Sequence, residues 1–241
     1  MERKERIDTM IASQGMASRS DVKSMIKKGE VIVNGVIVKD CGFKVGYNDE
    51  IIVRGEPLTQ SQYTYIMLNK PQGVVSATND SRDKTVVDIL PDNLKRKNLF
   101  PAGRLDKDTT GFCLITDDGD FAHNILSPSR HVTKTYIARV SQPIDYERAK
   151  EGFNKGVVLA DGTVLLSAAL IMLENSDKPL FKVIIKEGKY HQIKRMFGCF
   201  GAKVVELHRV AMGDLYLPSD LPEGQCRELT ETELNKLQQI K

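Results

Sequence analysis

The sequence lacks any long apolar run and any apolar leader. No stretch among its 241 residues approaches the roughly 20 consecutive apolar residues that a membrane-spanning helix needs. Residues 1–10, MERKERIDTM, are rich in charge and lack the apolar core of a signal peptide. We therefore expect a cytoplasmic protein that has no membrane partner.

Cysteine is scarce, and its spacing is uninformative. The four cysteines lie far apart, with no CxxC pair and no histidine at metal-ligand spacing: Cys41, Cys113, Cys199 and Cys226. We expect reduced thiols and no metal site.

Several common catalytic motifs are also missing. The sequence contains no GxxxxGK[ST], no GxGxxG and no Ser-His-Asp context. These absences argue against enzymes that hydrolyse nucleotides or transfer hydride.

What is present is a local concentration of basic charge. The net charge is only +3. However, residues 19–28 hold four cations against one acid, and residues 186–209 hold six against two. Residues 128–139 add three cations and no acid. One such stretch is usually a solvated surface, but three of them favour a polyanionic partner such as nucleic acid.

The chain is expected to contain a small and a larger α+β domain. Residues 1–55 combine two short helical patterns with the hairpin VIVNGVIV, in which Asn34-Gly35 forms the turn. Residues 56–62 are polar and are predicted to be a linker. Residues 63–241 alternate strand patterns with fewer helices, which favours a mixed or antiparallel sheet over a doubly wound one.

One polar, glycine-rich stretch stands out: GRLDKDTTG, residues 103–111. It lies between the strand-like segments NLFPA and FCLIT, so it is expected to be a loop held by a rigid scaffold. Asp106 and Asp108 are not expected to act as a converging pair of carboxylates. The residues alone leave two alternatives, a solvated turn or a catalytic carboxylate placed among cations.

The N-terminal segment resembles the S4 RNA-binding module. The resemblance rests on SRSDVKSMIKKGEVIVNGVIV, residues 18–38. It implies that a basic helix contacts RNA through four cations: Arg19, Lys23, Lys27 and Lys28.

The remainder resembles the pseudouridine synthases. The motifs that carry the resemblance are YIMLNKPQGVVSAT (65–78), GRLDKDTTGFCLITDDGD (103–120), KTY (134–136) and EGKYHQIKRMF (187–197). Their order and spacing match from about residue 60 to residue 232. Such enzymes replace the C–N glycosidic bond of uridine by a C–C bond, and the resemblance implies that no cofactor takes part.

The resemblance also implies a role for particular residues. Asp106 would be the essential nucleophile or base, and Lys194 the cation paired with it. Tyr136 would stack on the uracil, Ile193 would contact its other side, and Arg104 would fill the space left by the flipped nucleotide. Three further cations are predicted to meet the substrate's phosphates: Lys134, Arg195 and Arg209. Without the resemblance, Lys194 would be interpreted as an exposed helix lysine, and Tyr136 and Ile193 as core residues.

The S4 module and the form of the last motif together resemble the RsuA-type, small-subunit branch. This implies a monomeric 16S rRNA pseudouridine synthase that acts on uridine 516, with a small-subunit assembly particle as partner. Two alternatives stay open: a large-subunit (23S) rRNA synthase, and a non-catalytic S4-type assembly factor whose loop acid is structural.

Overall fold

The computed structural model describes residues 4–14, 16–46, 48–58, 63–127, 130 and 132–238. The chain forms two compact units, one made of Met1–Thr64 with Leu90–Leu99 and the other of Tyr65–Ile89 with Phe100–Lys241. Within the described ranges, no helix is long and apolar enough to cross a membrane.

The first unit is a small α+β fold. Its elements are β1 (Glu5–Arg6), α1 (Ile7–Ser13), α2 (Arg19–Lys28), β2 (Val31–Val33), β3 (Val36–Ile37), β4 (Lys44–Val45), β5 (Ile51–Val53), β6 (Glu56–Pro57) and the 3-10 turn η1 (Asp92–Leu94). One sheet has the order β3-β2-β5-β6, and β1 pairs with β4. Strand pairing therefore continues into the predicted linker, because Glu56 pairs with Val53. Residues 59–62 of that linker lie outside the described residues, and the domain boundaries stay a prediction.

Helix α2 shows why this sequence folds locally. Ser18 forms a capping box with Asp21, which satisfies two backbone N–H groups at the start of the helix. Val22, Met25 and Ile26 are buried, and Gly29 ends the helix in the left-handed conformation with φ 77°. The predicted hairpin is present as β2 and β3.

The second unit is built on one mixed sheet of nine strands. Its elements are β7 (Tyr65–Lys70), β8 (Phe100–Pro101), β9 (Thr110–Thr116), α3 (Gly119–Leu126), β10 (Lys134–Val140), α4 (Tyr146–Lys155), β11 (Ala169–Glu174), β12 (Leu180–Ile185), α5 (Gln192–Gly198), β13 (Val204–Met212), β14 (Leu215–Tyr216), β15 (Cys226–Glu228) and α6 (Glu231–Gln238). The main path runs β11-β12-β10-β13-β9-β7-β15, with β14 beside β13 and β8 beside β9. The α+β class with a mixed sheet is therefore confirmed.

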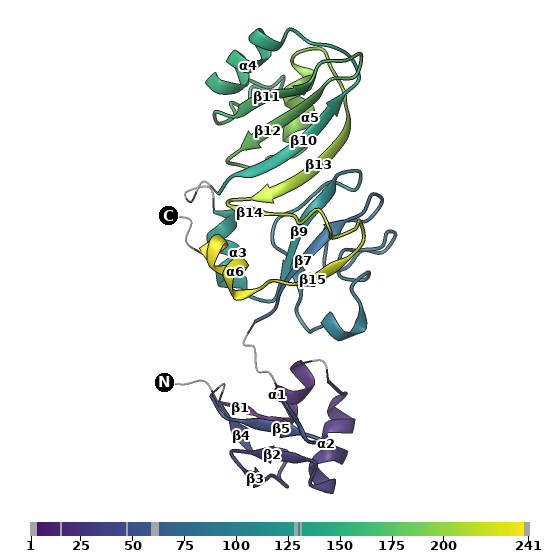
Figure 1. Cartoon of the computed structure of the whole chain (residues 1–241), viewed down its shortest axis with the longest axis vertical. Coiled ribbons are helices and arrows are strands. Elements are labelled where there is room, and N and C mark those ends of the chain that lie inside the picture. The colour runs from purple at the N-terminus through teal and green to yellow at the C-terminus, as the bar shows by residue number, and fades with distance from the viewer. Residues whose placement is uncertain are drawn as a thin grey trace. The chain divides into compact units, whose positions relative to one another are not determined.

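The sheet has two halves that meet at β9 and β13 (Figure 1). The pairs within each half are antiparallel, whereas β13 pairs with β9 in parallel. The junction matches His208 with Thr110 and Arg209 with Gly111.

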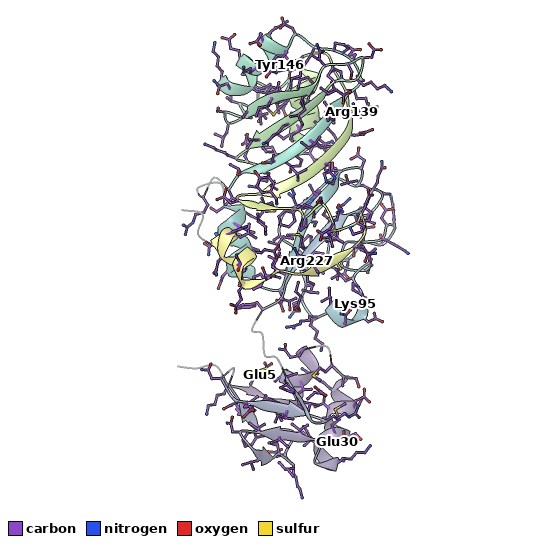
Figure 2. All side chains as sticks on the ribbon, in the orientation of Figure 1. Glu5, Glu30, Lys95, Arg139, Tyr146 and Arg227 are labelled. Atoms are coloured by element: carbon purple, nitrogen blue, oxygen red, sulfur yellow. The ribbon has the colours of Figure 1, made fainter. Side chains whose placement is uncertain are left out.

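Each half of the sheet is covered by helices, and a separate apolar cluster lies between the helices and each half. On the β10–β12 half, Phe197 of α5 packs against Phe153 of α4 and Phe181 of β12, with ring centroids 5.3 and 5.4 Å apart. On the other half, α3 and α6 pack together over β7 and β9. Arg227 of β15, labelled in Figure 2, donates two hydrogen bonds of 2.7 Å to Glu233 and so ties α6 to the sheet edge.

The clearest apolar runs of this part of the sequence become β7, β9, β10 and β12. In contrast, β13, which is central to the sheet, and α6 come from segments without such a run. Helix α3 is capped by Asp118, whose side chain accepts a hydrogen bond from the Phe121 backbone N–H at 2.9 Å.

Candidate active site

The polar loop between β8 and β9 is a tight turn held by buried groups. The Thr109 backbone N–H donates to the Asp106 carbonyl at 3.1 Å, and the Leu105 N–H donates to Ser76 Oγ at 3.1 Å. From β7, the fully buried Lys70 ammonium donates to the carbonyls of Thr109 at 2.9 Å and Lys107 at 3.3 Å. The backbone on both sides of Asp106 is thereby fixed to the sheet.

Asp106 faces two basic side chains near the start of α5. Lys194 Nζ lies 2.8 Å from Asp106 Oδ2, and His191 Nε2 lies 3.5 Å from Oδ1. The carboxylate is 28% exposed, so it stays reachable from outside. The structure thus brings together the predicted pair, Asp106 and Lys194, from positions 88 residues apart.

The same ammonium also binds Asp108. Lys194 Nζ lies 2.6 Å from Asp108 Oδ1, and this hydrogen bond holds the pKa of Asp108 below its usual value. Burial alone would lower the pKa of Lys194, but the hydrogen bonds to Asp106 and Asp108 outweigh it, so its pKa is raised. The expectation that Asp106 and Asp108 do not converge was wrong, because residues two apart in an extended chain share one side and the loop also turns after Asp106.

Beside Asp106 lies a small pocket, which we call the base pocket. It holds about 400 Å³ of empty space, part of it open to solvent. Its lining comes from the polar loop, the sheet and the start of α5: Arg104, Leu105, Asp106, Thr109, Tyr136, Ile185, Gly188, Lys189, His191, Gln192, Ile193 and Leu207. A carboxylate at the edge of a pocket with apolar and aromatic walls suits a flat, uncharged ring.

Three of the predicted substrate contacts lie at this pocket. Tyr136 of β10 and Ile193 of α5 are buried, with 7% and 3% of their surface exposed, and both line it. Arg104 is exposed, and its side chain makes no hydrogen bond or ion pair with any residue in the described ranges. Its guanidinium is therefore available to a ligand.

Three other predicted contacts lie elsewhere or are already engaged. Arg209 is 2% exposed and donates from Nε to the Phe112 carbonyl at 2.7 Å, so it joins β13 to β9 instead of facing solvent. Lys134 is 7% exposed, and burial lowers its pKa to about 8. Arg195 forms an ion pair with Asp161. In the structure, Lys134 and Arg209 are buried and Arg195 is paired with Asp161, so none of the three offers a free cation to a phosphate.

Sequence reasoning missed the groups that shape the start of α5. The buried Gln192 side chain accepts from the Lys189 backbone N–H at 2.9 Å and donates to Glu187 at 3.2 Å. His191 adopts the left-handed conformation with φ 46°. The only sequence signal was their presence within EGKYHQIKRMF, where a polar run before an amphipathic helix gives no hint of these contacts.

In the first unit, the four predicted RNA-binding cations lie on α2. They are all exposed: Arg19, Lys23, Lys27 and Lys28. The acid within the helix, Asp21, is used in the capping box. The outer surface of α2 is therefore basic.

Comparison with known families gives two matches. The family described as RNA pseudouridylate synthase matches residues 64–198, and the S4 domain matches residues 5–51. Among solved structures, one described as the crystal structure of pseudouridylate synthase superposes with a TM-score of 0.66 and 38% identity, covering 96% of this chain and 99% of that chain.

Individual relatives match along nearly their whole length. The uncharacterized RNA pseudouridine synthase YtzG of Bacillus subtilis (strain 168) is 44% identical over 234 residues, covering 96% of this chain and 98% of that protein. The ribosomal small subunit pseudouridine synthase A of Escherichia coli (strain K12) is 41% identical over 230 residues, covering 95% of this chain and 98% of that protein.

Proposed function

The chain belongs to the RNA pseudouridine synthase family, and on that premise we propose that it converts a uridine of small-subunit ribosomal RNA into pseudouridine. The observation that carries the chemistry is the Asp106 carboxylate held by Lys194 at the edge of the base pocket. The choice of small-subunit RNA is supported by the similarity to the Escherichia coli enzyme of that name. We take uridine 516 of 16S rRNA as the specific target to be tested.

The reaction needs one group that acts at the sugar. The C1′–N1 bond of uridine breaks, a C1′–C5 bond forms, the proton on C5 leaves, and N1 gains a proton. Asp106 serves as a nucleophile toward C1′ or as a base toward a sugar proton. In either role Asp106 acts as a carboxylate, and Lys194 Nζ, 2.8 Å from Oδ2, holds that carboxylate at the edge of the base pocket.

The target base must also leave its stack to enter the site. Extruding a base from structured RNA costs a few kcal/mol. We propose that Arg104, exposed at the mouth of the base pocket, fills the vacated space while Tyr136 and Ile193 hold the uracil. A buried aromatic ring and an aliphatic side chain can contact the two faces of a flat base.

Affinity for the long RNA is assigned to the basic surface of α2. Phosphate contacts by Lys and Arg are largely independent of sequence and position the RNA for readout elsewhere. We propose 16S rRNA in a partly assembled small subunit as the partner. We predict that the chain is a monomer and that it lies in the cytoplasm.

The first experiment maps the product. The protein is incubated with 16S and 23S transcripts and with small-subunit particles, and pseudouridines are located by chemical mapping. We expect one new pseudouridine in 16S rRNA, at uridine 516. Modification confined to 23S rRNA would favour a large-subunit synthase instead.

The second experiment tests Asp106. Asn keeps the shape of the side chain but can act neither as nucleophile nor as base, so Asp106→Asn is expected to abolish tritium release from C5-labelled RNA while binding is nearly unchanged. Asp83→Asn is the matched control, since Asp83 pairs with Lys107 at 2.6 Å and not with Lys194. Activity of Asp106→Asn within tenfold of wild type contradicts the catalytic assignment and favours a binding protein.

A further inference from the structure

Tyr190 is an aromatic side chain that the fold leaves in solvent. Its exposed fraction is 73%, the highest of any exposed large apolar or aromatic side chain among the described residues. An exposed ring contributes no burial to the stability of its own chain. The residues around Tyr190 therefore show whether the ring is placed to contact a ligand.

The ring of Tyr190 is held in place by its neighbour. His191 lies parallel to it, with ring centroids 3.8 Å apart and an interplanar angle of 19°. His191 adopts this position with a left-handed backbone, φ 46° and ψ 35°, which is uncommon for a residue other than glycine. Local strain of this kind persists where the surrounding structure fixes it, often at functional sites.

The stacked pair lies where the base pocket opens into a wider groove, which we call the flanking groove. The groove holds about 1190 Å³ of empty space, part of it open to solvent. It shares four lining residues with the base pocket: Arg104, Leu105, Asp106 and His191. Tyr190 lines the flanking groove but not the base pocket. A chain that places one nucleotide in the base pocket would therefore continue along the flanking groove.

The charges in the flanking groove have both signs. Its acids are Asp80, Asp106 and Asp108, and its cations are Arg104, Lys107 and Lys194. Lys194 is engaged by two of the acids, and Lys107 pairs with Asp83. A surface of balanced charge suits an uncharged base face better than a string of phosphates.

We propose that Tyr190, backed by His191, is a stacking platform for the nucleobase that flanks the target uridine. Aromatic side chains commonly hold unstacked RNA bases in this way. This inference rests on the proposed function, because it places the flanking nucleotide relative to a uridine in the base pocket. The platform recognises the flat face of a base and so tolerates different bases at that position.

The first test uses fluorescence. The sequence contains no tryptophan, so Tyr190→Trp introduces a single indole that keeps the stacking surface. Titration with the 16S transcript is expected to quench its emission, because a stacked base quenches indole. The matched control is Tyr216→Trp, at a tyrosine of β14 that is 57% exposed and lies outside the flanking groove. Equal quenching in both variants, or none, overturns the platform.

The second test uses single-turnover kinetics over a range of RNA concentration. Tyr190→Ala is expected to raise the half-saturating RNA concentration by roughly tenfold, the size expected for losing one base–aromatic stack. Tyr190→Phe should stay close to wild type, Tyr190→Leu should resemble Tyr190→Ala, and Tyr216→Ala should be unchanged. If wild type modifies 16S rRNA while Tyr190→Ala matches Tyr216→Ala, the platform fails and the proposed function stands. If wild type modifies no rRNA, the proposed function itself fails.

Discussion

At the scale of single residues, one ammonium group is divided between two carboxylates. Lys194 lies 2.8 Å from Asp106 and 2.6 Å from Asp108. Lys194→Met is expected to lower the saturating single-turnover rate by roughly tenfold or more, because Asp106 loses the contact that holds its carboxylate at the base pocket, and a misplaced catalytic group commonly costs this much.

Asp108→Asn is expected to be the milder change. Lys194 keeps its contact with Asp106, so the saturating single-turnover rate should stay close to that of the wild type. Lys194→Arg keeps the charge and should keep much of the activity, although the guanidinium has a different geometry. A Lys194→Met protein that binds RNA more weakly but keeps the wild-type saturating rate would make Lys194 a phosphate contact and leave Asp106 positioned by another group.

Two buried lysines, Lys134 and Lys70, have similar pKa values but different hydrogen bonding, so their substitution is expected to change the free energy of unfolding in opposite directions. Burial lowers the pKa of both Lys134 and Lys70 to about 8. Lys70 donates hydrogen bonds to three carbonyls, whereas Lys134 makes none with the described residues and lies near the like charge of Arg209. Lys134→Met is therefore expected to stabilise the protein at neutral pH, by up to roughly 3 kcal/mol for a pKa lowered by this amount. Lys70→Met should destabilise it, because it leaves buried carbonyls without donors.

The pH dependence follows from the same values. Between pH about 8 and 10.5 the unfolded chain holds a proton on Lys134 that the folded chain has released, so wild-type stability rises with pH across this window. Lys134→Met lacks that contribution, and its advantage over wild type should shrink as pH rises through the window. Urea unfolding at several pH values measures the difference, and a Lys134→Met protein less stable than wild type at pH 7 would contradict the prediction.

The sequence was informative about the reacting pair and poor about burial. Asp106, Tyr136, Ile193 and Lys194 were brought together as the motifs implied. Lys134 and Arg209 were predicted to be phosphate contacts but lie buried in the sheet, because a charged residue in a strand does not reveal whether its side chain faces water or the inside of the sheet. Asp108 was missed because its partner Lys194 lies 86 residues away and reaches it only through the fold.

At the scale of elements, Gly111 sets how closely β9 approaches β13. Its φ is +99°, and a Cβ there would lie 2.3 Å from the Arg209 carbonyl oxygen and 2.8 Å from the Arg209 nitrogen. Gly111→Ala is expected to lose roughly 3 kcal/mol of unfolding free energy, because backbone strain and a clash with backbone atoms combine. Equilibrium denaturation in urea measures this loss.

The strain and the clash can be separated with another glycine. Gly162 has φ +81° but no heavy atom within 4 Å of the position of an added Cβ. Gly162→Ala should lose only roughly 1 kcal/mol, the cost of the backbone conformation. Equal losses at the two positions would mean that the strands can move apart to accept a methyl group.

The elements that the sequence predicted have a clear apolar period, and the ones it missed do not. Helix α2 buries Val22, Met25 and Ile26 at helical spacing. Strand β13 carries His208 and Arg209 within a sheet, so its alternation is broken by two polar residues that pair with β9. Its place at the centre of the sheet depends on distant partners.

At the scale of the whole molecule, the first unit is expected to add affinity and the second chemistry. A triple Gln variant of the exposed lysines of α2 should bind 16S rRNA more weakly, and the slope of log affinity against log salt should fall by roughly 2 to 3, or a little under one for each lost phosphate contact. The substituted residues are Lys23, Lys27 and Lys28.

The control removes the same charge from the second unit. It replaces three exposed lysines outside the base pocket and the flanking groove: Lys178, Lys203 and Lys236. This variant should keep the wild-type slope. Equal slopes for both triple variants would mean that α2 faces something other than RNA.

Because the active site spans the parallel junction of β9 and β13, catalysis depends on the two halves of the sheet staying paired. Asp106 belongs to the half of the sheet that contains β9, and Lys194 belongs to the half that contains β10 and β13. Each half closes by antiparallel pairing, but the junction joins residues such as Thr110 and His208 that are 98 apart in sequence. Such a non-local seam carries a large loop-closure entropy and tends to form late in folding and to open early in local unfolding. Amide exchange along Thr110–Gly111 and the loss of catalysis are therefore expected to follow the same sub-global opening, before either half loses its strands.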